Sequence, residues 1–107
     1  MAGGKPHLYC VINNPAKHGN QALIVNVTGN TRGDKSCQIY IGEHKFIKKL
    51  SGIAYWGAET KLCTDIEWEI KNGRWQKTDD FSPEIIERIR RGASVSPDFP
   101  PVFLKFL

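Results

Sequence analysis

The chain has 107 residues, of which 40% are hydrophobic and 24% are charged, a mixture typical of one folded domain. This composition argues against an intrinsically disordered segment, which would be poorer in apolar residues. The 15 lysines and arginines outnumber the 11 aspartates and glutamates, and the resulting formal charge of +4 favours anionic partners.

Three widely spaced cysteines, Cys10, Cys37 and Cys63, lack the C-x-x-C pairing of a structural zinc site. We expect reduced, buried thiols, as is usual in the cytoplasm. The start of the chain lacks the apolar run of a signal peptide, and no segment reaches the roughly 20 apolar residues of a membrane span. We therefore expect a single cytoplasmic domain over residues 1–107, with no membrane contact, no metal and no cofactor.

Short apolar stretches rich in β-branched and aromatic residues predict strands, and polar stretches rich in Asn and Gly separate them. Residues 22–28, ALIVNVT, are continuously apolar at their centre, which is typical of a strand buried on both faces. Gly57 interrupts the last apolar stretch and predicts a bulge or a bend. Residues 1–6 are expected to be a flexible start. The predicted strands are 8–12, 22–28, 36–41, 53–56 and 58–63.

Residues 64–76 fit two structures. Apolar and polar residues alternate from Ile66 to Ile70, and the Asn-Gly pair that follows is typical of a hairpin turn. The same segment also fits a helix, because its opening TDIE matches a capping box and the two isoleucines share one helical face. We favour a short helix and keep the hairpin as the alternative.

Residues 82–92 predict a helix more directly. Ser82 is a typical N-cap residue, Pro83 suits the first helical position, and three isoleucines form one apolar face. Gly92 is typical of a helix end. The tail that follows, residues 93–107, contains three prolines and is expected to be extended. Its apolar end should dock as an edge strand or against the core, or otherwise mark a partner surface.

The order of these elements, strands first and helices late, predicts an α+β fold. We expect a small, strongly bent antiparallel sheet or an SH3-like barrel, followed by one or two helices. No strand-helix alternation of the kind that builds a parallel sheet is visible.

Basic side chains are concentrated between residues 32 and 49. Five lysines and arginines stand there against Asp34 and Glu43, so this stretch carries most of the excess positive charge of the chain. Charge concentrated in one place matters for nucleic-acid binding, because each neutralised phosphate releases counterions. Apolar residues within GEHKFIKKLS can anchor the stretch on the core and leave its basic side chains outside. The five basic residues are Arg32, Lys35, Lys45, Lys48 and Lys49.

These residue types suffice for cleaving RNA without a metal, which requires a base, an acid and a cation beside the phosphate. His44 is the candidate for proton transfer, since its ordinary pKa lies near 6.5. Lys48 and Arg32 are the candidates for holding the phosphate. The same composition is also found on solvated basic loops that bind nothing. Further candidates for contacting the substrate are Lys45, Lys49, Ser51, Tyr55 and His18, with Tyr55 available for stacking on bases.

The layout resembles the small barrel of PemK- and MazF-type toxins. The resemblance rests on the opening strand LYCVI, the buried strand ALIVNVT, the basic segment and the late helix. It implies an SH3-like barrel, metal-independent cleavage of single-stranded RNA, a homodimer and an antitoxin as protein partner. It also adds Thr28, at the place where the family has a polar residue after its apolar strand. The arginine that those toxins carry before the central strand has no counterpart at residues 18–21.

Two functional hypotheses follow. The first is a toxin-like, metal-independent endoribonuclease acting on single-stranded RNA, with His44 at its centre. The second is a non-catalytic module of the same fold, which binds nucleic acid or a protein partner through the basic segment or the apolar tail.

Overall fold

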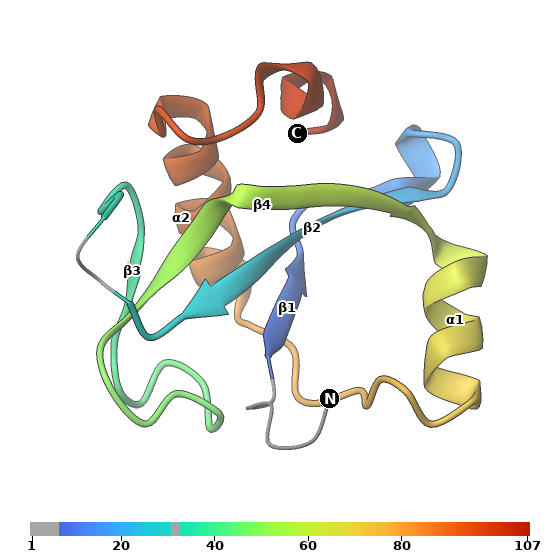
Figure 1. The fold of residues 1–107 in the computed structure, drawn as a ribbon, viewed down its shortest axis with the longest axis horizontal. Coiled ribbons are helices and arrows are strands. Elements are labelled where there is room, and N and C mark those ends of the chain that lie inside the picture. The colour runs from blue at the N-terminus through green and yellow to red at the C-terminus, as the bar shows by residue number, and fades with distance from the viewer. Residues whose placement is uncertain (1–6, 31–32) are drawn as a thin grey trace.

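The computed structural model describes residues 7–30 and 33–107 (Figure 1). Strands come first and both α-helices come late, as the sequence predicts. The elements, with η denoting a 3-10 helix, are β1 (Leu8–Val11), η1 (Pro15–Lys17), β2 (Gln21–Thr28), β3 (Gln38–Ile39), β4 (Ser51–Leu62), α1 (Cys63–Lys71), α2 (Pro83–Val95) and η2 (Pro101–Phe106).

The four strands form one antiparallel sheet in the order β1-β2-β4-β3. The α+β class with a small antiparallel sheet is confirmed, and within the described residues the sheet does not close into a barrel. The predicted strand over residues 36–41 is reduced to Gln38–Ile39, which pairs with the start of β4. β1 and β3 are therefore the two edges of the sheet.

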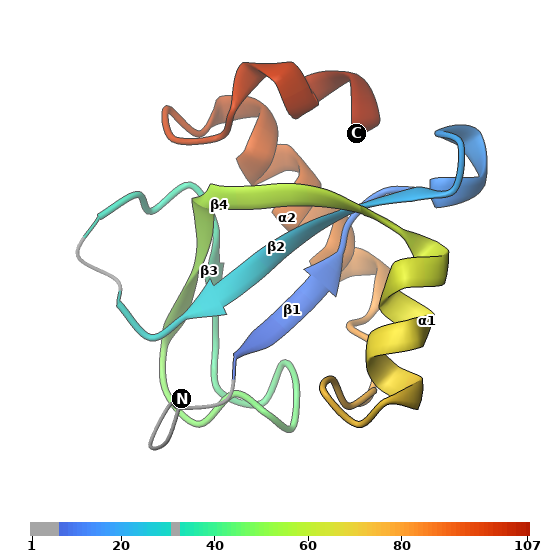
Figure 2. The ribbon, with the colours of Figure 1, turned by 45° about the vertical axis from the view of Figure 1, so that its right-hand side comes forward.

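β4 is one long strand where the sequence predicted two. Ile24 of β2 pairs with Glu59, and Asn26 pairs with Ala54, so residues 55–58 of β4 lie opposite the single residue Val25. Such an excess of residues on one strand bends it and increases its twist. β4 accordingly turns sharply along its length in Figures 1 and 2. Gly57 lies within this bulge, as the sequence suggested.

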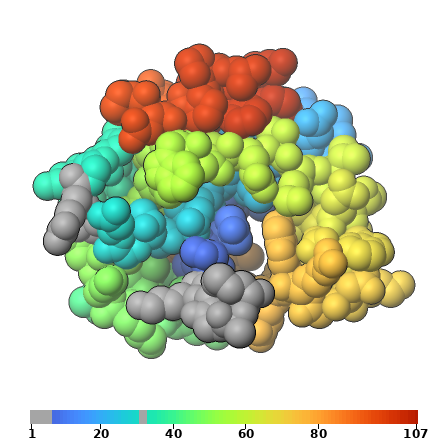
Figure 3. Space-filling view, in the orientation of Figure 1, coloured from blue at the N-terminus to red at the C-terminus, as the bar shows by residue number. Residues whose placement is uncertain are grey.

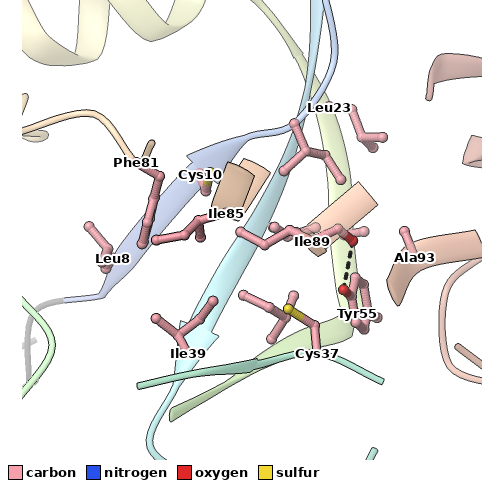
Figure 4. Close-up of a cluster of buried hydrophobic side chains, with 14 of the residues drawn as sticks. Leu8, Cys10, Leu23, Cys37, Ile39, Tyr55, Phe81, Ile85, Ile89 and Ala93 are labelled. Carbon is pink, nitrogen blue, oxygen red and sulfur yellow. Dashed lines mark hydrogen bonds between the residues drawn. The ribbon is translucent and has the colours of Figure 1, made fainter. Parts of the chain in front are cut away.

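The core lies between the sheet and α2 (Figure 4). Ile85, Ile89 and Ala93 are buried at the spacing of one helical face and pack against side chains of the sheet. At the β4 bulge, the Tyr55 hydroxyl is fully buried and donates a hydrogen bond of 2.7 Å to the carbonyl of Ile89. Burial raises the pKa of Tyr55 far above its ordinary value, so this hydroxyl stays protonated as a donor.

The segment that fitted two structures is a helix. α1 covers Cys63–Lys71, and Gly73, with φ +75°, follows its C-cap Asn72. The hairpin alternative is therefore wrong. α1 begins one residue before the predicted capping box, and no side chain caps its first turn.

α2 is longer than the sequence predicts. Ser82 caps it, with its hydroxyl accepting from the N–H of Ile85, and Pro83 is its first residue, both as expected. Gly92, however, does not end the helix. It is buried against Tyr55 and Cys37, and a Cβ at this position would collide with the Tyr55 hydroxyl. Gly92 is thus required for close packing of α2 on the sheet.

The tail also differs from expectation. Its first residues belong to α2, and Pro101–Phe106 form η2 instead of an extended segment, because proline fits the first position of a helical turn. Phe103, Phe106 and Leu107 pack against the core. The expected flexible start, residues 1–6, lies outside the described residues. Of the helices formed by the described residues, none has the length and apolar character needed to cross a membrane.

Gly92→Ala tests the contact between α2 and β4. At a solvent-exposed position inside a helix, replacing glycine with alanine raises the free energy of unfolding by about 1 kcal/mol. Here we expect a loss of about 2–3 kcal/mol in the free energy of unfolding, because the added methyl group displaces the Tyr55 hydroxyl. Urea unfolding measures the difference, and Arg91→Ala at the exposed neighbouring position is the matched control. An alanine at position 92 that stabilises the protein would contradict the packing described.

Candidate nucleic-acid interface

Residues 40–50, here called the basic loop, connect β3 to β4. Ile47 is buried in the core, whereas Lys45, Lys48 and Lys49 are exposed. Aromatic side chains lie among these lysines. Tyr40 is 53% exposed and Phe46 is 42% exposed. The loop therefore presents cations and aromatic rings together to solvent.

His44 holds the basic loop from inside. It is only 6% exposed, and its ring lies 4.6 Å from the ring of Phe81, measured between centroids. The N–H of Phe46 donates to Nδ1 over 3.0 Å, so the ring hydrogen must be on Nε2, which donates to the carbonyl of Asp79 over 2.6 Å. Both ring nitrogens are thus engaged, and the imidazole joins the loop to the segment that leads into α2.

A second contact fixes the start of the basic loop. Arg88 of α2 donates two hydrogen bonds, of 2.7 and 2.8 Å, to the two carboxylate oxygens of Glu43. Glu43 also accepts from the N–H of Tyr40, and Arg88 donates to the carbonyl of Gln38. The hydrogen bonds from Arg88 hold the pKa of Glu43 below its ordinary value. The charge pair therefore favours one conformation of the loop.

Four of the predicted site residues gather at one end of the β2–β4 pair. Lys48, Lys49 and Ser51 line a hollow of about 250 Å³, and Thr28 lies beside it because it pairs with Gly52 in the sheet. The Ser51 hydroxyl donates to the carbonyl of Lys49 over 2.9 Å, and Thr28 Oγ1 accepts from the N–H of Asn30 over 3.1 Å. These hydroxyls stabilise local backbone, while the two lysines remain exposed.

The other predicted site residues lie elsewhere. Tyr55 is in the core, and His18 packs near the tail, with its ring centroid 5.5 Å from that of Phe106. Lys45 forms an exposed ion pair with Asp79 over 3.3 Å. Arg32 lies outside the described residues.

The sequence did not single out Phe46 as a ligand-contacting group, or Arg88 and Asp79 as partners of the basic loop. Phe46 was expected to anchor the loop on the core, but nearly half of its side chain faces solvent. Asp79 and Arg88 follow their partners by 35 and 45 residues. Local sequence patterns do not pair residues over such separations. The only local cue to these contacts is the helical pattern that places Arg88 on α2.

No known protein family, curated protein or solved structure matches this chain. The resemblance to PemK- and MazF-type toxins therefore stays a prediction. Within residues 7–30 and 33–107, no group of three or more His, Cys, Asp or Glu side chains is arranged to hold a metal ion.

His44→Ala should destabilise the fold. It leaves the Phe46 N–H and the Asp79 carbonyl without partners and opens space beside Phe81, which together should lower the free energy of unfolding by about 3 kcal/mol. Lys45→Ala, next in sequence but exposed, should change it by about 0.5 kcal/mol or less. Urea unfolding of the two variants gives the comparison, and equal stabilities would refute the structural role of His44.

Glu43→Gln should have an effect that depends on pH. Because the folded protein holds the pKa of Glu43 below its ordinary 4.5, the stability gained from the ion pair is complete above about pH 4.5. It is lost as the pH falls further, through the lowered pKa. The difference in unfolding free energy between wild type and variant should therefore shrink in acid.

Urea titrations from about pH 7 to about pH 3 measure this difference. Arg88→Met removes the same ion pair from the other side and should give the same pH profile. A difference for Glu43→Gln that is independent of pH would show that the ion pair contributes nothing to stability.

Proposed function

We propose that this protein is a non-catalytic module that binds single-stranded RNA through its basic loop. The observation that carries the proposal is the composition of the loop surface, where Lys45, Lys48 and Lys49 are exposed together with Tyr40 and Phe46. Single-stranded nucleic acids are held by the same two kinds of group. Cations neutralise the phosphates, and aromatic rings stack on the unpaired bases.

The internal contacts of the loop support binding. His44 and the Glu43–Arg88 pair hold the loop in one conformation, so less conformational entropy is lost when a ligand binds. Lys48 and Lys49 have no ion pair within the described residues and are available to phosphates. The excess positive charge of the chain adds long-range attraction.

The geometry of His44 favours binding over cleavage. A general base needs a free lone pair within reach of the substrate, but the Nδ1 lone pair accepts from the Phe46 N–H and the ring is buried. The toxin-like endoribonuclease, the antitoxin partner and the homodimer remain predictions from sequence. The test below separates binding from cleavage.

We expect the Lys48→Ala/Lys49→Ala double variant to weaken binding of a labelled, unstructured RNA oligonucleotide about tenfold at about 0.1 M salt. The slope of log K against log salt should become shallower by about 1.4, since each phosphate contact on a single strand contributes about 0.7. Fluorescence anisotropy over a range of salt concentrations measures both quantities.

Lys17→Ala/Lys105→Ala makes the same change in net charge on η1 and η2, which lie away from the basic loop in Figures 1 and 2, and should leave the slope nearly unchanged. Equal effects of the two double variants would place the RNA elsewhere.

Gel analysis of RNA incubated with the wild-type protein in EDTA tests for cleavage. Intact RNA is expected, and a cleavage product that accumulates with turnover would replace this proposal with the endoribonuclease.

A further inference from the structure

A cavity of about 1310 Å³ lies along the free edge of β1. Side chains from both faces of β1 line it, Leu8 and Cys10 from the core face and Tyr9 and Val11 from the other. Its far wall is the segment of residues 74–81 that runs from α1 towards α2. Figure 3 shows a hollow between the blue atoms of β1 and the orange atoms of this segment. The cavity is larger than the roughly 300–1,000 Å³ of small-molecule sites.

The backbone of β1 has hydrogen-bonding groups that face this cavity. Ile12 donates its N–H to the carbonyl of Leu23 over 3.0 Å, which fixes the alternation along the strand. In an antiparallel pair, residues with groups directed at the partner strand alternate with residues whose groups point away. The backbone N–H and C=O groups of Tyr9 and Val11 therefore point away from β2. The N–H groups of these two residues have no partner within the described residues. The Val11 carbonyl accepts one hydrogen bond there, from the Cys10 thiol over 3.7 Å.

Apolar side chains flank this edge. The Tyr9 ring stacks on Trp75 of the far wall with a centroid distance of 5.5 Å and an interplanar angle of 8°. Ile66 and Ile70 of α1 also line the cavity, and Val11 is 42% exposed. A strand added beside β1 would place every second side chain on this apolar surface.

The charges around the cavity suit a neutral ligand better than a polyanion. Three cations and three anions line it, so its formal charge is zero, in contrast to the basic loop. Residues 74–81 line the same cavity, and their Trp75 stacks on Tyr9, so this segment obstructs the approach of a second folded sheet to the β1 edge. The charged residues are Lys45, Arg74 and Lys77 against Asp79, Asp80 and Glu87.

We propose that this cavity binds an extended peptide, which pairs with Tyr9 and Val11 as an additional strand on β1. Apolar side chains at alternate positions of the peptide contact Tyr9, Trp75 and the inner face of α1. The site is independent of the proposed RNA binding, although Lys45 and Phe46 border both surfaces.

To test this, peptides of about eight residues, somewhat longer than a typical strand, are selected from a displayed random library for binding to the full-length protein. Enriched sequences should carry apolar residues at every second position. One of them is then synthesised with a single N-methyl group at each position in turn. Methylation should weaken binding about fivefold at the alternate positions that face β1 and hardly change it at the positions between, because only the former amides donate to the strand.

Amide hydrogen exchange of the wild-type protein provides a second measurement that needs no variant. The bound peptide should slow exchange at Tyr9 and Val11, whose N–H groups face the cavity, well beyond any change at Cys10, whose N–H already bonds to β2. A library without enriched sequences, N-methyl effects without a period of two, or unchanged exchange at Tyr9 and Val11 would each overturn the proposal. Displacement of the peptide by the RNA oligonucleotide would overturn its independence from the basic loop.

Discussion

The hydrogen bond from the Tyr55 hydroxyl to the Ile89 carbonyl sets the position of α2 on the sheet. It lies in a fully buried place, where a donor without a partner would cost about 1–3 kcal/mol. The β4 bulge brings Tyr55 to this point, and Gly92 leaves the space that its hydroxyl requires. The position of α2 in turn determines where Arg88 reaches the basic loop. A hydrogen bond in the core thus influences the conformation of the basic loop at the surface.

The basic loop divides its residues between two tasks. His44, Glu43 and Ile47 point inward and hold the backbone, whereas the lysines and the two aromatic rings point outward. Most of the ordering entropy of the loop is therefore lost on folding and not on binding. The neutral cavity beside β1 differs from it in both charge and shape. The two surfaces meet at Lys45 and Phe46, so one protein can present a cationic face and an apolar groove side by side.

Local patterns in the sequence predicted much of the fold. Ser82, Pro83 and the isoleucines of α2 identified a helix because capping and periodicity act within a few residues. The continuity of β4 could not be predicted in this way, since it depends on pairing with β2. Gly92 carried a misleading local signal, because packing against Tyr55 and not chain termination explains it.

The candidate site shows the same limit. The sequence correctly placed lysines on an exposed segment, because charged side chains remain in water when nothing pairs with them. It could not show that His44 is buried, since its partner Asp79 lies 35 residues away. A histidine among lysines has the same local sequence whether it is a surface base or an internal hydrogen-bonding residue.

The two edges of the sheet differ in how well they resist uncontrolled association. β3 has only two residues, and Arg88 occupies the Gln38 carbonyl, so this edge offers little to a foreign strand. On β1, the N–H groups of Tyr9 and Val11 have no partner within the described residues, and residues 74–81 line the cavity beside them. An exposed strand edge can pair with other chains, and residues 74–81 leave less of the β1 edge open to the sheet of a neighbouring molecule.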